Sequence, residues 1–410
     1  MENKKLTKLE KYWIMYDVGN SAFVMLIATI IPIYFNYLAK SAGISEVNYL
    51  AYWGYAASVS TVIVAVIGPV LGSIADMQNY KKPLFTISMM VGVIGCAAMS
   101  FPTSWVVFLA VFVIAKVGYN ASLIFYDSML VDITSTDRMD EVSSQGYAWG
   151  YIGSCIPFIL SLVLVLMYEK IGITMHMAMT GAFILNAVWW AVVTIPLLRN
   201  YRQKNYVAVP SHSVKNSFKR LGQTFMDVHK EKKIFWYLLA FFFFIDGVYT
   251  IIEMATAYGS ALGLDSTGLL LALLVTQIVA FPCALICAKL SGKYPTEQLI
   301  GVCIVAYIGI ALFAIQLDKQ WEFWTLAVLV GMFQGAIQAL ARSYFAKIIP
   351  AEKSGEYFGI YDICGKGASF MGTTLVGIVA QVTGVANAGV AVIAVLFVIG
   401  YILFKKAVRA

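Results

Sequence analysis

Long apolar stretches alternate with short polar segments along almost the whole chain. A helix that crosses the hydrocarbon core of a bilayer needs roughly 20 mostly apolar residues. The alternation therefore predicts an all-α integral membrane protein with twelve transmembrane helices. The predicted spans are residues 12–37, 51–75, 84–101, 105–130, 146–168, 177–198, 234–258, 268–288, 299–316, 321–345, 357–382 and 388–404.

The one long polar segment, residues 199–233, divides the spans into two sets of six. We expect an N-terminal six-helix bundle over residues 1–198, a basic linker, and a C-terminal six-helix bundle over residues 234–410. Within the linker, four apolar residues recur at helical spacing, which is typical of an amphipathic helix lying on a membrane surface. They are Phe218, Leu221, Phe225 and Val228. The alternative is a loosely ordered linker.

Basic residues are distributed unevenly between the two sides of the predicted membrane. Of 29 Lys and Arg residues, only Lys40, Lys170 and Lys319 fall in segments on one side, and Lys116 and Lys366 lie inside spans. The other Lys and Arg residues lie on the opposite side, either in the polar segments or at the helix ends next to them. Because cytoplasmic loops carry the excess of Lys and Arg, both termini are predicted to be cytoplasmic. The short outer loops favour a bacterial cytoplasmic membrane.

Composition supports the membrane assignment and narrows the partners. The chain of 410 residues is 60% hydrophobic and 12% charged, with a mean hydropathy of +0.78, whereas a soluble domain carries about 25% charged residues. The net charge of +7 is spread over many loops, which indicates contact with anionic lipid and no nucleic-acid partner. We expect a monomer without cofactor or metal, and unpaired cysteines, since all six lie in spans.

Glycines four residues apart are typical of helices that pack closely in lipid, as at Gly68/Gly72 and Gly146/Gly150. Weak sequence echoes between the halves, such as residues 68–76 with residues 281–289, favour two related bundles with a cavity between them.

A short motif follows the second span. Gly72 and Asp76 lie four residues apart at the helix end, and Lys81 and Lys82 follow in the turn. An acid at a helix end beside basic residues can form a charge cluster that breaks when two bundles move, although an ordinary solvated loop has the same charges. The spacing resembles the loop signature of the major facilitator superfamily. In the second half the motif is degraded, with Lys289 in the place of the acid.

Four further stretches resemble a narrower family. They are YDVGNSAF at 16–23, DGVYT at 246–250, QGAIQALARS at 334–343 and FGIYDICGK at 358–366. In combination and order they resemble the autophagy-related vacuolar amino-acid effluxers and their bacterial relatives. The chain departs from that pattern at Val18-Gly19, where the family favours Trp-Ala, and at Ala341, where it has Ser. The resemblance implies the twelve-helix facilitator fold and transport of a small solute, with amino acids as the substrate class.

Charged residues inside predicted spans are the main candidates for function, since a charge near the bilayer centre costs about 2.5–3.5 kcal/mol on insertion scales. Asp246 lies midway along the seventh span, and Glu253 follows two turns later on the same face. Lys116 lies midway along the fourth span. Asp362 and Lys366 are four apart and can pair with each other.

Three interpretations of Asp246 and Glu253 stay open: a proton-carrying carboxylate, a group that binds the amino end of a zwitterion while Lys116 or Lys366 binds its carboxylate, or a partner in a fixed salt bridge that ties helices together. For Asp362 and Lys366 a fixed pair is favoured. The remaining candidates are polar groups in or near the spans. Asp17, Asn20, Tyr249, Gln334 and Gln338 are assigned to solute binding or coupling, although interhelical hydrogen bonds explain the amides equally well, and Arg342 with Asp362 to gating.

Other functional classes have little support. The chain has no phosphate-binding loop of the G-x-x-x-x-G-K-[ST] type, and its three histidines lie outside the spans. An intramembrane enzyme is therefore disfavoured, and a receptor without transport activity is the main alternative. The sequence predicts a secondary active or facilitative transporter of a small polar solute that works by alternating access, with amino acids and proton coupling as specific expectations.

Overall fold

The computed structural model describes residues 5–207, 223–224, 226–261, 264, 266–384 and 386–410. These residues contain twelve helical segments long and apolar enough to cross a membrane, which confirms the predicted all-α, twelve-span architecture. The first eight helices are α1 (Lys8–Ala28), α2 (Ile30–Ser41), α3 (Glu46–Ala75), α4 (Lys81–Ala98), α5 (Trp105–Ser128), α6 (Leu130–Ile133), α7 (Met139–Ile171) and α8 (Met175–Asn200). The others are α10 (Lys232–Ala261), α11 (Ser266–Leu290), α12 (Thr296–Ile315), α13 (Gln320–Ile348), α14 (Ser354–Thr383) and α15 (Ala386–Arg409).

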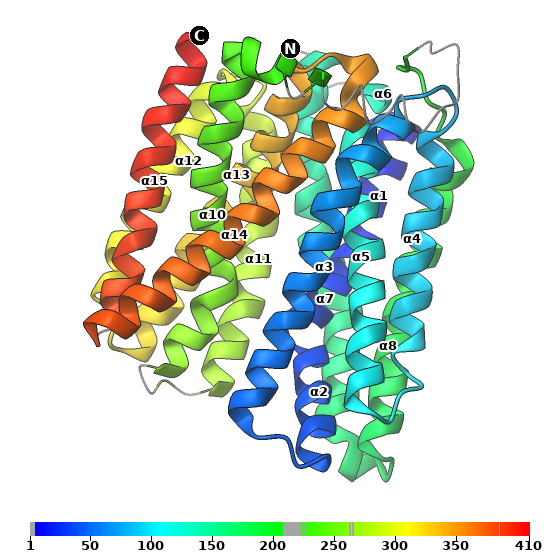
Figure 1. The fold of residues 1–410 in the computed structure, drawn as a ribbon, viewed down its shortest axis with the longest axis vertical. Helices are drawn as coiled ribbons and strands as arrows, with labels where there is room; N and C mark the ends of the chain where they lie inside the picture. The colour runs from blue at the N-terminus through cyan, green and yellow to red at the C-terminus, as the bar shows by residue number, and fades with distance from the viewer. Residues whose placement is uncertain (1–4, 208–222, 225, 262–263, 265, 385) are drawn as a thin grey trace.

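The helices gather into two groups that lie side by side (Figure 1). In the first group α1 packs on α7 and α8, and α5 packs on α3 and α4. In the second group α15 packs on α10 and α12, and α11 packs on α13. The groups meet where α14 contacts α3 and where α7 contacts α11 and α13. Both chain ends lie at the same end of the molecule, which we call the terminal face (Figure 1).

The first span departs from the single helix that its hydropathy predicts. The helix is interrupted at Thr29, whose hydroxyl donates to the carbonyl of Met25 at 2.5 Å. Pro32 follows in the first turn of α2. A proline has no amide hydrogen, and its ring clashes with the carbonyl four residues earlier, so the helix breaks at this point.

Glycines allow helices to approach closely near the terminal face, both between the two groups and within the first group. A Cβ atom on Gly72 of α3 would lie 2.2 Å from the carbonyl oxygen of Gly355 at the start of α14. A Cβ atom on Gly146 of α7 would lie 2.4 Å from a carboxylate oxygen of Asp17. These contacts confirm that the small residues serve helix packing.

Most of the predicted amphipathic linker helix lies outside the described residues, including Phe218, Leu221 and Phe225. Residues 226–230 are helical, and the side chain of Val228 is buried. The linker therefore enters α10 through a helical segment that packs against the protein.

Candidate functional site

A buried arginine joins the two helix groups near the terminal face. Arg342 of α13 donates from Nη1 to Asp127 of α5 at 3.0 Å and from Nη2 to Asp17 of α1 at 3.3 Å. Its Nε donates to the hydroxyl of Ser143 on α7 at 2.9 Å. Only 2% of Arg342 is exposed, so these charge-assisted hydrogen bonds are little screened by water. The carboxylate of Asp17 is buried as well, because the guanidinium covers it.

Aromatic rings complete the enclosure of this guanidinium. Its carbon lies 4.5 Å from the ring centre of Tyr147, 4.6 Å from that of Trp13 and 5.4 Å from that of Tyr126. Planar guanidinium groups stack favourably on such rings. All of these partners belong to the first group, so Arg342 ties the second group to the first.

The loop motif forms a second junction, between α3 and α14. Asp76 accepts hydrogen bonds from the backbone amides of Gly355 at 2.7 Å and Glu356 at 2.9 Å. A carboxylate is favoured there because the N-terminus of a helix carries free amides and a partial positive charge. Burial acts in the opposite direction and raises the pKa of Asp76 to about 7. The motif is thus a direct contact between the two groups.

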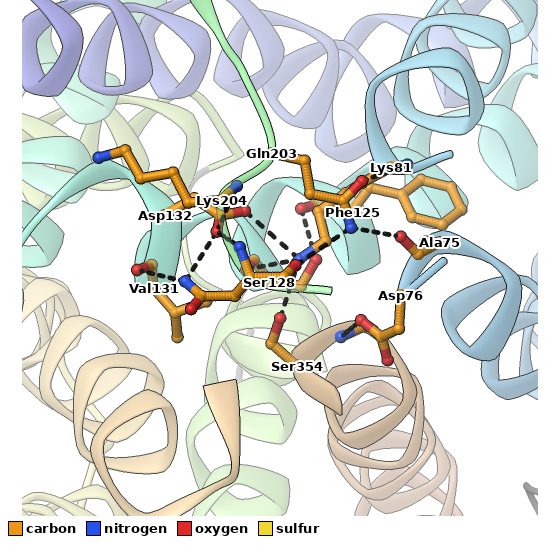
Figure 2. Close-up of polar contacts among 12 residues, drawn as sticks. Ala75, Asp76, Lys81, Phe125, Ser128, Val131, Asp132, Gln203, Lys204 and Ser354 are labelled. Carbon is orange, nitrogen blue, oxygen red and sulfur yellow. Dashed lines mark hydrogen bonds and ion pairs between the residues drawn. The ribbon is translucent and has the colours of Figure 1, made fainter. Parts of the chain in front are cut away.

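Lys81 extends this junction (Figure 2). Its buried ammonium donates to the hydroxyl of Ser354 at 2.9 Å and to the carbonyl of Ser128 at 3.4 Å, and it lies 3.6 Å from the carboxylate of Asp132. Lys82, predicted to act with Lys81, is partly exposed. Of the two lysines, Lys81 is therefore the one that supports the junction between α3 and α14.

Asp132 of α6 was not identified from the sequence, yet it organises the surroundings of Lys81. One oxygen accepts from Tyr201 at 2.6 Å, and the other accepts from the backbone amides of Lys204 and Asn205 at 3.2 and 2.8 Å. Burial and the adjacent carboxylate raise the pKa of Tyr201 well above its ordinary value. The start of the linker is thereby fastened to the loop motif (Figure 2).

A third junction joins α7 to α12 and α13. Asp140 accepts from the hydroxyls of Ser343 at 2.6 Å and Thr296 at 2.5 Å and pairs with Lys347 at 2.5 Å. Here the acid belongs to the first group and the cation to the second. Asp140 therefore supplies an acid for an ion pair between the two groups, although Lys289 replaces the acid of the loop motif in the second half.

Further charged groups lie farther along the helices from the terminal face, at the boundary between the groups. Lys366 of α14 pairs with Asp362, as its spacing predicts, and also donates to the carbonyl of Asn120 on α5 at 3.4 Å. Lys116 interacts electrostatically with both Glu253 and Lys366, so the three charged side chains lie near one another. Tyr249 also interacts electrostatically with Asp362 and Glu253.

Asp246 and Glu253 share a helix face in the sequence but not an environment in the structure. Asp246 is fully buried and accepts a hydrogen bond from the amide of Gly372 at 3.0 Å, whereas Glu253 is exposed. The structure therefore does not join them as a pair.

Two of the amide side chains that were predicted to bind solute make hydrogen bonds within the protein. Asn20 donates to the carbonyl of Tyr16 at 3.0 Å, and Gln338 donates to the hydroxyl of Tyr151 at 3.3 Å. Gln334 and Gln277 border a small, largely apolar cavity of about 50 Å³ between α10, α11 and α13. These residues lie near the boundary, but their contacts also suit a packing role.

Solved structures with the same arrangement define the class. The chain matches the Escherichia coli protein FucP, solved in an outward conformation, with a TM-score of 0.73 over 98% of this chain and 97% of that one at 10% identity. It matches a bacterial homologue of the iron transporter ferroportin, solved in an outward-facing state, with a TM-score of 0.71 over 98% and 99% at 12% identity. The protein has the fold of a major facilitator superfamily transporter.

Sequence comparison gives the family. The chain belongs to the family described as vacuole effluxer Atg22 like, whose model matches residues 7–138 and 131–409. It is 41% identical to the "uncharacterized MFS-type transporter YxiO" of Bacillus subtilis strain 168, over 98% of this chain and 95% of that protein. It is 21% identical to autophagy-related protein 22 of Coccidioides immitis, over 81% of this chain and 68% of that protein. The predicted family is therefore confirmed.

Proposed function

We propose that this transporter moves a small zwitterionic solute of the amino-acid class by alternating access. The observation that carries the proposal is the set of opposite charges deep at the boundary between the helix groups, where Lys116 and Lys366 lie near Glu253 and Asp362. The lysines suit a carboxylate and the acids suit an ammonium group. The resemblance to vacuolar amino-acid effluxers supports the same substrate class.

Residues 1–198 and 234–410 act as the two moving bundles in this proposal, and residues 199–233 connect them. The polar contacts made by Asp76, Asp140 and Arg342 close the terminal face. With the terminal face in the cytoplasm of a bacterium, as the distribution of basic residues favours, this conformation is closed to the cytoplasm. Breaking the three junctions opens the cytoplasmic side.

Transport is driven by a proton gradient in this proposal. Acidic residues within the spans supply groups that can gain and lose a proton as their surroundings change during the cycle. Two carboxylates share the single guanidinium of Arg342, and Asp246 is buried without a cationic partner among the described residues.

The test is uptake of a radiolabelled mixture of amino acids into proteoliposomes, with and without an inward proton gradient. Lys116→Met removes a charge of the proposed site, and we expect it to abolish uptake. Lys170→Met is the matched control, because Lys170 is exposed at the far end of α7. Uptake by wild type that is unchanged in the Lys116→Met variant would contradict the proposed site. Binding of labelled amino acid without flux would indicate the receptor alternative.

A further inference from the structure

Asp246 of α10 has two oxygens in different surroundings. One oxygen accepts hydrogen bonds from the amide of Gly372 at 3.0 Å and from the hydroxyl of Thr250 at 3.3 Å. The second oxygen is buried and has no hydrogen-bond partner among the residues that the structure describes. The residue as a whole has no exposed surface.

The described residues of the neighbouring helices bring no positive charge to this carboxyl group. Among the residues that the structure describes, the one ionised side chain that acts on it is Glu253, an acid two turns further along α10. The contact from α14 is the backbone of Gly372. From α15, Phe397 packs against Gly247, the next residue of α10. A second negative charge and apolar surfaces both disfavour an ionised Asp246.

An unpaired, buried carboxylate costs far more free energy than the neutral acid, which needs only hydrogen bonds. We infer that Asp246 carries a proton on its unpartnered oxygen while the terminal face is closed, and that this is the proton moved in the transport cycle. The inference rests on the proposed function and names the residue that couples it to the gradient. Loading forms one O–H bond with a proton from water, and release breaks the same bond.

The contact with α14 couples the protonation of Asp246 to the rest of the proposed site. Helix α14 begins with Gly355, which binds Asp76 at the terminal face, continues through Lys366, and reaches Gly372. At 1.5 Å per residue, Gly372 is about 9 Å along the axis from Lys366. A Cβ atom on Gly372 would lie 2.3 Å from the Asp246 oxygen, so only glycine allows this approach. A change of charge on Asp246 therefore acts directly on α14, the helix that carries both the junction with α3 and Lys366 of the proposed solute site.

Asp246→Asn tests the inference, because the amide has the shape of the neutral acid but cannot release a proton. In proteoliposomes, exchange of internal for external labelled amino acids needs no net proton movement, whereas accumulation against a gradient does. We expect the variant to keep exchange and to lose accumulation, its ratio of internal to external label falling to about one, since a carrier without differential proton binding cannot use the gradient. Asp318→Asn is the matched control, because Asp318 is an exposed acid at a helix end.

Two results would overturn the inference: accumulation by Asp246→Asn equal to that of wild type, or loss of exchange in a folded variant. Infrared spectroscopy supplies a measurement that does not depend on the solute. In the difference spectrum between purified wild type and the variant at neutral pH, a C=O stretching band of a protonated carboxyl group should be present, because protonated acids common to both proteins cancel. If wild type transports no amino acid, the substrate proposal fails, while the presence or absence of this band still decides whether Asp246 carries a proton.

Discussion

The guanidinium of Arg342 lies 3.0 Å from the carboxylate of Asp127, and these residues belong to different helix groups. The same guanidinium also lies 3.3 Å from the carboxylate of Asp17. Both acids come from the first group, and the cation comes from the second. Separation of the groups at the terminal face must therefore break two buried ion pairs at once. This relationship makes Arg342 a principal lock of the closed conformation.

Replacement of Arg342 by Gln should open the terminal face. Removing one partner of a buried ion pair costs about 3–5 kcal/mol, because the remaining charges are left unpaired. We expect the variant to have a lower melting temperature and a smaller closed population. Cys287 is a native reporter, since its thiol is buried on α11 near the seam with α7. In a chain that keeps only this cysteine, a water-soluble maleimide should label the variant faster than wild type.

Arg202→Gln is the matched control for this prediction, because Arg202 is exposed beyond the end of α8. Equal labelling rates in wild type, Arg342→Gln and Arg202→Gln would show that Arg342 does not hold the face closed. Arg342→Lys should be intermediate, since an ammonium group keeps the charge but not the fork that reaches two carboxylates and Ser143.

A methyl group at Gly355 should prevent closure at the junction of α3 and α14. Its Cβ atom would lie 2.5 Å from the carbonyl oxygen of Gly72 and 2.9 Å from a carboxylate oxygen of Asp76. Gly355→Ala should therefore reduce transport and increase the labelling of Cys287. Gly367→Ala on the same helix should change neither, because no atom of the described residues lies within 4 Å of a Cβ atom placed there. Similar effects of both substitutions would indicate a general change in α14.

Hydropathy predicted the twelve spans because each helix must satisfy its backbone internally and bury about 20 apolar residues in lipid. The spacing of Asp362 and Lys366 predicted their ion pair for a similarly local reason. The loop motif was identified as a charge cluster at a helix end, and its partner, the start of α14, became visible only in the fold.

Asp132 and Asp140 were missed for the opposite reason. In the sequence both acids lie in a short polar segment between two spans, where an ordinary solvated loop is the simplest interpretation. Their burial arises from distant parts of the chain, the linker for Asp132 and α12 and α13 for Asp140. The seven-residue spacing of Asp246 and Glu253 likewise predicted a shared face, but α14 covers only the first of them. Residue spacing does not contain such long-range contacts.

Substitutions of Asp362 and Lys366 should separate a structural role from a role in transport. Each single change, Asp362→Asn or Lys366→Met, leaves one charge without its partner and should cost about 1–3 kcal/mol of stability. The double change removes both charges, so the melting temperature should recover. Uptake of labelled amino acids should not recover, because the proposed site has lost both groups. Recovery of uptake together with stability would show that the pair is only structural.

Closure of the terminal face should depend on pH through the titration of the Asp76 carboxyl group. Burial raises the pKa of this carboxyl group to about 7 in the closed conformation, whereas a solvent-exposed aspartate titrates near about 3.9. The closed form therefore binds the proton more tightly, and acidification favours closure. Between pH 8 and pH 6 the ratio of closed to open molecules should rise about tenfold, and the effect should be lost above the higher pKa. Spin labels at Arg202→Cys and Glu352→Cys, both exposed positions, would report the separation across the face. Asp76→Asn should weaken this dependence, and a distance distribution that responds to pH equally in both proteins would assign the titration to another group.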